Sequence, residues 1–267
     1  MNALDQLKNS FGFIKIPFSK GFSVNELYIS PTMKNVLSAM EIATSNEEAA
    51  VITGASGCGK TNVLRYFINQ LDTNSYQCAY IAVNNCKIGE IAKRSLSALG
   101  IPAPYQAAGA LRKLRDSVME INASRSQKTI LIIDEAQELT TSTLLELKSL
   151  LNYKIDSDNL LFLLLCGHTT LDDMLNMVPL ESLKRRIRIR CEIKPLSLEE
   201  TGAYIQHHFT ISGQTRKIIT DDAVALIYRQ SRGNPGEINK YCFNAIIKAA
   251  ALSKDIIEPS LIEDKNG

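Results

Sequence analysis

The chain has 267 residues, of which 45% are apolar and 22% charged, so it can bury a substantial core as one large domain with room for a small satellite. Thirty Lys and Arg face 28 Asp and Glu, so the net charge of +2 does not indicate a polyanion partner, and any basic surface must be local. No secretion signal or membrane-length apolar run is found, and the six cysteines lack CxxC spacing. These features predict a cytoplasmic protein with reduced thiols and no membrane partner.

Strand and helix patterns alternate over most of the chain. Residues 11–31 form an aromatic-rich segment with no sustained helical period, and a helix is expected from Ser30, with Pro31 in its first turn. We expect strands at 49–53, 78–83, 129–133, 160–166 and 187–193, and helices at 60–71, 88–99, 107–123 and 143–151. This alternation predicts an α/β fold with a parallel five-stranded sheet covered by helices on both faces.

After Pro195 the pattern contains helices only, and their starts carry capping signals. Ser197 to Glu200 reads as a capping box, Thr220 precedes two aspartates, and Asn234-Pro235 opens the last long helix. The expected organisation is an N-terminal arm at 1–31, a core at 32–195, a small all-helical lid at 196–255 and a frayed tail at 256–267.

The stretch GASGCGKTN, residues 54–62, follows an apolar strand and precedes a helix, the context of a phosphate-binding loop. Its glycines let backbone N–H groups point at phosphates, at the positive end of the following helix. Lys60 is expected to reach the β and γ phosphates, and the Thr61 hydroxyl to ligate Mg²⁺. The predicted cofactors are ATP and Mg²⁺, and the predicted binding residues are Gly54, Ala55, Ser56, Gly57, Cys58, Gly59, Lys60, Thr61 and Asn62.

Two further strand ends carry polar groups. The apolar strand ending at Asp134 and Glu135 would deliver Asp134 to Mg²⁺, and Glu135 would polarise a water for in-line attack. His168 follows the next strand and would either orient the water or sense the γ-phosphate, or else act as a capping residue at the strand exit.

The segment from Lys184 to Arg190 is the densest basic stretch, and its alternation from Arg186 to Arg190 fits a strand with one basic face. Three interpretations remain open: a solvated face, a nucleic-acid contact, or an arginine finger presented to the ATP of a neighbouring subunit. Because Arg185 and Arg186 precede the strand, they are the candidates for the finger.

These motifs together resemble the AAA+ ATPases of the ExeA/GspA secretion type and their relatives, the MuB, IstB, TniB and TnsC-like ATPase partners of DDE transposases. The resemblance rests on FGF…PF at 11–18, GASGCGKT, IIDEAQ with Gln137, LLCGH, LKRRI and SRGNPGEIN. It implies an AAA+ fold with Asp134 for Mg²⁺, Glu135 as the catalytic carboxylate, His168 near the first sensor, and Arg185 or Arg186 acting across subunits. One departure is Gly236, where the family has arginine. A lid arginine on the γ-phosphate is then lacking, unless Arg232 replaces it, and we expect weak or partner-dependent hydrolysis.

Secretion-type relatives continue into a membrane helix and a further domain, whereas this chain ends soon after its lid. We therefore expect the transposition branch, an ATPase that oligomerises as a ring or filament on duplex DNA and recruits or activates a transposase, with or without a target-selecting adaptor. The alternative is a secretion-associated or signalling ATPase with no DNA role. The candidate contacts to DNA phosphates are Lys87, Lys93, Arg94, Arg112, Lys113 and Arg115, for which a solvated helix face is the other interpretation. Phe18 or Tyr28 of the arm would pack either near the adenine or simply onto the core.

Overall fold

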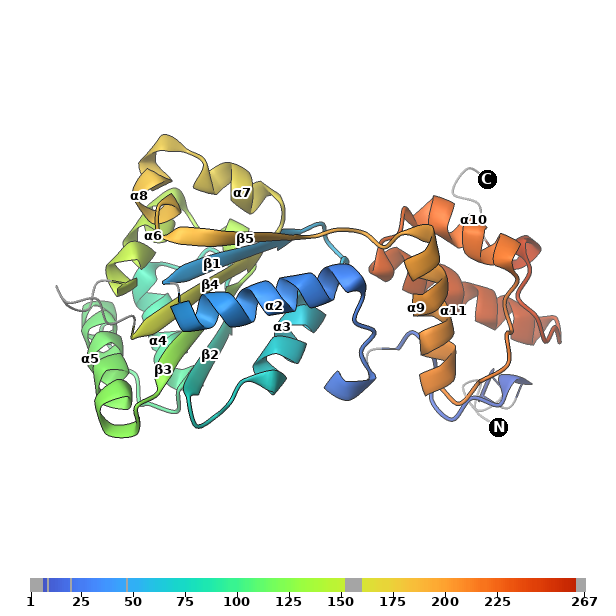
Figure 1. Cartoon of the computed structure of the whole chain (residues 1–267), viewed down its shortest axis with the longest axis horizontal. Coiled ribbons are helices and arrows are strands. Elements are labelled where there is room, and N and C mark those ends of the chain that lie inside the picture. The colour runs from blue at the N-terminus through green and yellow to red at the C-terminus, as the bar shows by residue number, and fades with distance from the viewer. Residues whose placement is uncertain (1–6, 9, 20, 47, 152–159, 263–267) are drawn as a thin grey trace. The chain divides into compact units, whose positions relative to one another are not determined.

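The computed structural model describes residues 7–8, 10–19, 21–46, 48–151 and 160–262 (Figure 1). The chain divides into two compact units. The larger, the core unit, contains Thr32–Ala55 and Lys60–Ile193, and the smaller, the helical unit, contains the residues up to Pro31, Ser56–Gly59, and those from Lys194 onward.

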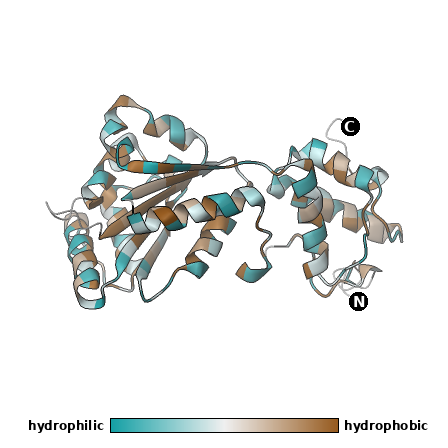
Figure 2. Cartoon of the chain, in the orientation of Figure 1, coloured by the Kyte–Doolittle hydropathy of each residue, from teal (hydrophilic) through white to brown (hydrophobic). Residues whose placement is uncertain are grey.

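The core unit is built on a parallel five-stranded sheet. Its strands are β1 Ala49–Gly54, β2 Tyr76–Ala82, β3 Lys128–Asp134, β4 Leu161–Gly167 and β5 Ile187–Ile193, in the spatial order β2-β3-β4-β1-β5. The three central strands are buried along nearly their whole length, because their residues are almost all apolar and helices cover both faces (Figure 2). The parallel order brings the carboxyl ends of β1, β3 and β4 to one edge of the sheet.

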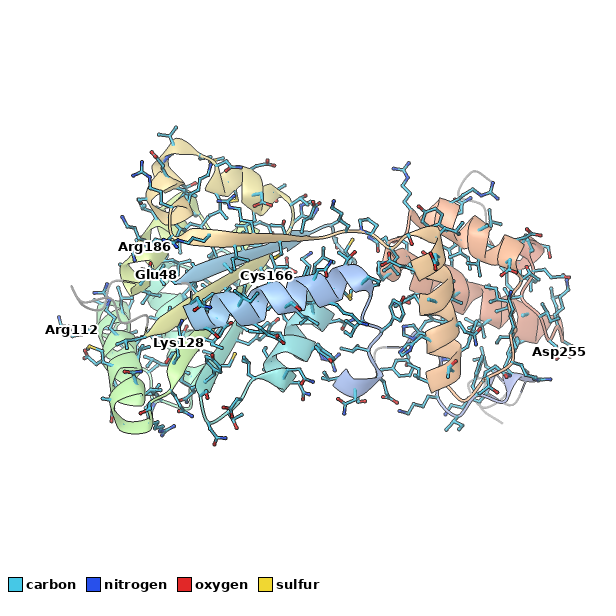
Figure 3. All side chains as sticks on the ribbon, viewed as in Figure 1. Glu48, Arg112, Lys128, Cys166, Arg186 and Asp255 are labelled. Carbon is cyan, nitrogen blue, oxygen red and sulfur yellow. The ribbon has the colours of Figure 1, made fainter. Side chains whose placement is uncertain are left out.

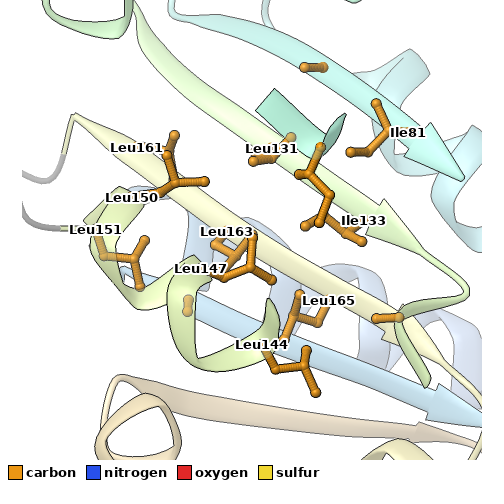
Figure 4. Packing of buried hydrophobic residues seen from close by; sticks show 14 of the residues in the cluster. Ile81, Leu131, Ile133, Leu144, Leu147, Leu150, Leu151, Leu161, Leu163 and Leu165 are labelled. Atoms are coloured by element: carbon orange, nitrogen blue, oxygen red, sulfur yellow. The ribbon is translucent and has the colours of Figure 1, made fainter. Parts of the chain in front are cut away.

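Helices cover the two faces of this sheet. In Figure 1, α2 (Pro31–Asn46) and α3 (Lys60–Gln70) lie over one face. The other face packs against α4 (Ile88–Ala98), α5 (Ala107–Arg125) and α6 (Thr141–Leu147) in one hydrophobic cluster. Figure 4 shows Leu144 and Leu147 of α6 beside Leu163 and Leu165 of β4. Short segments complete the unit: η2 Ala136–Glu138, η3 Lys148–Leu151, α7 Thr170–Leu175, η4 Val178–Leu180 and α8 Glu181–Lys184.

The helical unit consists of α9 (Leu198–Ile211), α10 (Asp221–Ser231) and α11 (Pro235–Ala251), with the short turns η1 (Val24–Glu26) and η5 (Pro259–Leu261). The predicted caps are confirmed: Ser197, Thr220 and Asn234 each accept backbone N–H groups in the first turn of their helices. Residues Ser56–Gly59, from the loop between β1 and α3, are grouped with this unit. The carbonyl oxygen of Ser56 accepts a hydrogen bond from Asn234 Nδ2 at 2.7 Å.

The N-terminal arm packs into the core of the helical unit. Phe18 is buried against His208 and Phe209, and Tyr28 lies edge-on to Tyr204. The arm thus packs on the helices that follow Pro195, a third position beside the two expected for it, the adenine and the core at 32–195.

The predicted fold class is confirmed, since all five strands, their parallel arrangement and the flanking helices are present. Two details differ. The helix expected at 143–151 begins earlier, at Thr141, and gives way to 3₁₀ turns after Leu147. Residues 256–262 are not frayed: Ile257, Leu261 and Ile262 are buried in the helical unit, because apolar side chains recur there at a spacing that one turn can present to the core. Residues 263–267 lie outside the described part of the chain. Within that part, no helix has the length and apolar character needed to cross a membrane.

Candidate active site

The phosphate loop connects β1 to α3, and its glycines meet specific steric needs. Gly57 and Gly59 have φ values of +81° and +95°, which side chains rarely tolerate. A Cβ at Gly54 would lie 2.9 Å from the carbonyl oxygen of Ile193 on β5, so this position needs a residue without a side chain. The backbone of the loop therefore depends on glycine at all three positions.

Lys60 and Thr61 occupy the first turn of α3. Lys60 is 8% exposed, and its Nζ donates hydrogen bonds to the carbonyl oxygens of Gly54 at 2.9 Å and Ala55 at 3.2 Å. These contacts hold the ammonium group over the start of the loop. The other predicted loop residues divide by exposure: Ser56, Gly57, Thr61 and Asn62 are exposed, Ala55 and Gly59 are partly exposed, and Cys58 is buried. The hydroxyl of Thr61 is thus accessible at the positive end of a helix.

Asp134 ends β3 and is 4% exposed. Its Oδ1 accepts the backbone N–H of Glu135 at 2.9 Å, and its Oδ2 accepts the hydroxyl of Tyr80 at 2.8 Å. Burial, with the neighbouring Asp134 carboxylate, raises the pKa of Tyr80 above its usual value, so the phenol stays protonated and remains a donor. The carboxylate is therefore held in one orientation. Tyr80 was not predicted as a site residue, although a tyrosine among the small and apolar residues of β2 is a signal that could have drawn attention to it.

Cys166 is on the neighbouring strand β4, one position after the Ile133–Leu165 pair, and therefore lies beside Asp134. Burial raises its pKa well above the usual thiol value, and the negative charges of Asp134 and Glu135 add to this, while Lys60 opposes it. The thiol is consequently protonated and unreactive at neutral pH. Lys60 comes after β1, Asp134 ends β3 and Glu135 follows it, and the parallel sheet brings the ends of these strands to one edge.

Glu135 follows Asp134 in a left-handed backbone conformation, with φ 58° and ψ 36°, and its side chain is exposed. Its Oε2 accepts a hydrogen bond from Gln137 Nε2 at 2.6 Å, and Gln137 Oε1 accepts the backbone N–H of His168 at 2.8 Å. The structure thus joins Glu135 and His168 through one side chain. The contacts of Gln137 were not predicted.

His168 is partly exposed at the exit of β4. Its Nδ1 lies 3.4 Å from the backbone nitrogen of Thr170 and 3.3 Å from the hydroxyl of Thr169. Because the Thr170 N–H is a donor, Nδ1 acts as acceptor, and a neutral ring carries its proton on Nε2. The capping role is therefore present, and Nε2 keeps an N–H group to offer.

A second polar network lies near the end of β1, and it was not predicted from the sequence. The Thr53 hydroxyl donates to Asp172 Oδ2 at 2.8 Å, and Arg190 Nη1 lies 3.4 Å from Asp172 Oδ1. Asp172 is in the first turn of α7, so this network ties α7 to both β1 and β5. The short α7 gave no sequence signal of its own.

The two finger candidates have different surroundings. Arg185 has a side chain that is 78% exposed and forms an ion pair with Glu181, one turn away, at 2.6 Å. Arg186 is 26% exposed and contacts Glu48 Oε2 at 2.8 Å and the carbonyl oxygen of Leu151 at 3.3 Å (Figure 3). Arg186 is thus tied into the core unit, while Arg185 extends from its surface.

The six candidate DNA contacts lie on α4 and α5 or directly before α4. Lys87, Arg112 and Lys113 are exposed. The other three have partners within the unit: Lys93 lies over the ring of Tyr105, Arg94 pairs with Glu90, and Arg115 donates to the carbonyl oxygen of Ser149. In the helical unit, Gly236 occupies the first turn of α11, and Arg232 is exposed in a left-handed conformation at the end of α10.

The chain has relatives of known family. A family model described as an AAA domain matches residues 43–175. General secretion pathway protein A of Aeromonas hydrophila is 30% identical over 245 residues, which make up 90% of this chain and 44% of that protein. The chain therefore spans less than half the length of this curated relative.

Solved structures with similar folds include the ORC2 protein of Aeropyrum pernix in its ADP form (TM-score 0.64, 14% identity, 91% of this chain and 70% of that one). Cdc6p of Pyrobaculum aerophilum is also similar (TM-score 0.67, 18% identity, 90% and 67%). A third is the RuvB Holliday junction branch migration motor of Thermotoga maritima (TM-score 0.54, 20% identity, 87% and 67%). These similarities show that the chain has the P-loop AAA+ fold.

The AAA domain match includes the phosphate loop, β3 with Asp134 and Glu135, and the exit of β4. The matched residues are thus those that the sheet brings together at its carboxyl edge. The AAA domain match, the fold and the site geometry thus agree, and the chain has the P-loop AAA+ fold.

Proposed function

We propose that Mg²⁺-bound ATP occupies the carboxyl edge of the sheet at β1, β3 and β4 and is hydrolysed there slowly. The observation that carries this proposal is the buried Asp134 carboxylate, which the Tyr80 hydroxyl and the backbone N–H of Glu135 hold at the end of β3. Among the described residues no ion pair with Asp134 is found, and a bound metal ion would offset the cost of burying its charge.

The residues present fit this ligand. The left-handed glycines of the loop suit a backbone curled around phosphates, and Lys60 supplies positive charge beside them. Mg²⁺ is commonly held by one or two protein oxygens, with phosphates and waters completing the shell. Thr61 and Asp134 would provide those protein oxygens, and no cluster of three or more His, Cys, Asp or Glu residues occurs in the described ranges. When bound, the metal would neutralise part of the phosphate charge.

The protein residues then have distinct tasks. Glu135, exposed and negatively charged, accepts a proton from the attacking water. Lys60 stabilises charge on the phosphates, and the Nε2 proton of His168 is available to a phosphate oxygen or to the water. Arg185 extends from the surface and serves the site of a neighbouring subunit, which makes hydrolysis depend on assembly. Gly236, where the resembling family has arginine, is a further reason to expect weak activity of the isolated protein.

Two substitutions test the site. Lys60→Ala should abolish binding of a fluorescent ATP analogue, because the charge that holds the phosphates is lost. Glu135→Gln should keep that binding and lose hydrolysis by about 10²-fold or more, because the amide cannot accept the proton. Asp173→Asn, which removes an exposed acid of α7, serves as the control and should change neither. Turnover above about 10 per second by the isolated wild-type protein, within the usual range of kinases, would contradict the proposal of slow hydrolysis.

For the partner, we propose duplex DNA in a transposition system, on which ATP-bound subunits assemble as a ring or filament and recruit or activate a transposase, with or without a target-selecting adaptor. Support comes from the sequence resemblance and from the exposed Lys87, Arg112 and Lys113 at the start of α4 and on α5. Contacts by such side chains would be mainly to phosphates, and would therefore be sensitive to salt and poor in base specificity.

The test is duplex binding with ATP, with ADP and without nucleotide, across a salt series. Binding should require ATP and strengthen in Glu135→Gln. Replacing Lys87, Arg112 and Lys113 with serine should lower the salt slope by about 0.9 per lost contact. The control replaces Lys217, Lys240 and Lys254 with serine. These three exposed lysines of the helical unit are ion-paired, and their loss changes the net charge equally. Electron micrographs with a slowly hydrolysed ATP analogue would report the assembly.

A second candidate is a secretion-associated ATPase without a DNA role, and the 30% identity to general secretion pathway protein A favours it. Absence of nucleotide-dependent DNA binding at low salt would remove the DNA proposal and leave this one. The secretion role would then be tested by whether this chain, joined to the remaining part of that relative, restores export in cells lacking the relative.

A further inference from the structure

Gln137 links the ends of two neighbouring strands. Its Nε2 donates to Glu135 Oε2 at 2.6 Å, and its Oε1 accepts the N–H of His168 at 2.8 Å. Glu135 directly follows β3, and His168 directly follows β4. One side chain therefore connects the proposed catalytic carboxylate to the segment that carries the candidate phosphate sensor.

The amide of Gln137 can make this connection in one orientation only. The His168 N–H is a donor and needs an oxygen, while the Glu135 carboxylate is an acceptor and needs an N–H group. Rotating the amide by half a turn would place its NH₂ group against the N–H of His168 and its oxygen against the carboxylate of Glu135. A glutamate at position 137 could still accept from His168, but it would repel Glu135.

The backbone around the link is shaped to form it. Glu135 has φ 58°, a left-handed conformation that is unfavourable for a residue with a side chain. The chain then enters the 3₁₀ turn Ala136–Glu138, which brings the side chains of residues 135 and 137 together. The N–H of Glu135 donates to Asp134 Oδ1, and this hydrogen bond fixes the backbone where the strained turn begins.

Gly167 provides the space that the link occupies. A Cβ at this position would lie 2.5 Å from Gln137 Oε1 and 3.1 Å from Leu171 Cδ2. The first of these clashes exists because the Gln137 amide lies against the end of β4. A glycine at the last position of a buried strand is thus accounted for by the neighbouring glutamine.

We propose that Gln137 is a positioning residue that holds one oxygen of the Glu135 carboxylate and couples it to the exit of β4. Oε2 is engaged by the amide, so Oε1 is the oxygen left to face the attacking water. A shift of the His168 backbone on contact with the terminal phosphate is transmitted through the amide to Glu135. This inference rests on the catalytic role proposed for Glu135.

The main test is Gln137→Met, which keeps the length of the side chain and removes both hydrogen bonds. We expect kcat to fall about tenfold, which is less than the ~10²–10⁴-fold that a positioned acid or base contributes. KM and ATP affinity should each change by less than about twofold. The His168 amide should exchange its hydrogen faster, because it loses its acceptor; this readout does not depend on activity. Gln70→Met, at the exposed end of α3 in the same unit, is the control and should change neither.

Gln137→Glu and Gly167→Ala separate the two halves of the link. Gln137→Glu keeps an acceptor for His168, so exchange of that amide should stay slow while kcat falls. Gly167→Ala pushes the amide away, so it should both lower kcat and speed the exchange. These variants also keep the test decisive if Gln137→Met does not fold.

The outcomes distinguish this inference from the proposed role of Glu135. If Glu135→Gln keeps its activity, that role is wrong. If Glu135→Gln is inactive but Gln137→Met and Gln137→Glu turn over at the wild-type rate, the positioning role of Gln137 is wrong. Effects should also be non-additive, so that Gln137→Met has no further effect on single-turnover hydrolysis by Glu135→Gln. Additive losses would indicate a general structural role and would overturn the inference.

Discussion

Tyr80 is the residue whose removal should separate metal binding from nucleotide binding. Its hydroxyl donates to the Asp134 carboxylate at 2.8 Å, and such contacts to a metal ligand typically change metal affinity by about 10–100-fold when lost. Tyr80→Phe should therefore raise the Mg²⁺ concentration that gives half-maximal ATPase activity by about tenfold. ATP binding measured in EDTA should stay the same, because the phosphate loop is intact.

Tyr105→Phe is the matched control, since Tyr105 is 96% exposed and also loses only a hydroxyl. It should leave the Mg²⁺ dependence unchanged. An unchanged Mg²⁺ dependence in Tyr80→Phe would mean that Asp134 keeps its orientation without the phenol, and the contact would then have no role in metal binding.

Among single residues, the sequence predicts those that belong to short motifs with a recognisable spacing. The loop from Gly54 to Thr61 and the pair Asp134-Glu135 are short motifs next to apolar strands, so they can be found without a structure. The contacts of Tyr80 and Asp172 join segments far apart in the chain. No spacing rule encodes them, because they depend on the register of neighbouring strands and on the position of a short helix.

Among the elements, α9 carries a buried titratable group that should make the helical unit sensitive to acid. His208 packs among Phe18, Phe22 and Tyr204, and its Nδ1 has no hydrogen-bond partner among the described residues. Burial, with the nearby His207, lowers the pKa of His208 from 6.5 to about 3. Below pH 6.5 the unfolded chain binds a proton at His208, whereas the folded state does not bind it until the pH is much lower. Stability is thus full above pH 6.5 and falls as the pH drops toward 3.

The loss should reach about 2 kcal/mol at pH 5, from ~1.4 kcal/mol per pH unit below the unfolded pKa. The measurement is hydrogen exchange of α9 amides at pH 8 and pH 5, corrected for the intrinsic pH dependence of exchange. His208→Phe should reduce this pH dependence, because a phenyl ring suits the aromatic surroundings and does not titrate. His168→Asn, in the core unit, should leave it as in the wild type. An equally steep loss in His208→Phe would place the acid sensitivity elsewhere.

A second prediction at this scale concerns the start of β5. Arg186 contacts Glu48, directly before β1, and the carbonyl oxygen of Leu151, so it ties three segments of the core unit together. Arg186→Ala should lower the free energy of unfolding by about 1–3 kcal/mol, because it leaves a part-buried carboxylate and a carbonyl oxygen without this donor. Arg185→Ala should change stability by less than about 1 kcal/mol, since its ion pair is exposed. Urea denaturation of both variants measures the difference, and equal losses would contradict it.

The elements themselves were largely predictable. Strands with continuous apolar runs and helices with polar caps have strong local signals, and all five strands and the three helices of the helical unit lie where expected. α7 was missed because six residues carry too little periodicity. The sequence predicts a frayed tail at 256–267, whereas residues 256–262 are ordered, because three apolar side chains are buried there against helices that come earlier in the chain.

For the whole molecule, the position of the proposed catalytic residues has consequences for assembly. Ser56–Gly59 of the phosphate loop are grouped with the helical unit, whereas Lys60, Asp134, Glu135 and Gln137 belong to the core unit. Arg185 belongs to the same unit, but its side chain extends into solvent. A group that serves catalysis from such a position must act on another molecule. The proposed assembly thus supplies the reason why hydrolysis should be slow in isolated subunits.

Mixing experiments test whether Arg185 acts across subunits. Arg185→Ala keeps its own phosphate loop and Glu135 but lacks the finger, and Glu135→Gln lacks the carboxylate but keeps the finger. Each alone should be nearly inactive, since an arginine finger contributes about 10³–10⁵-fold to the rate. In a mixture, Glu135→Gln subunits supply Arg185 to the intact sites of their neighbours, so ATPase activity should rise above the sum of the two. Such rescue requires contact between subunits and should vanish on dilution. If the mixture of Arg186→Ala with Glu135→Gln recovers activity and that of Arg185→Ala does not, the finger is Arg186, and its contact with Glu48 must open on assembly.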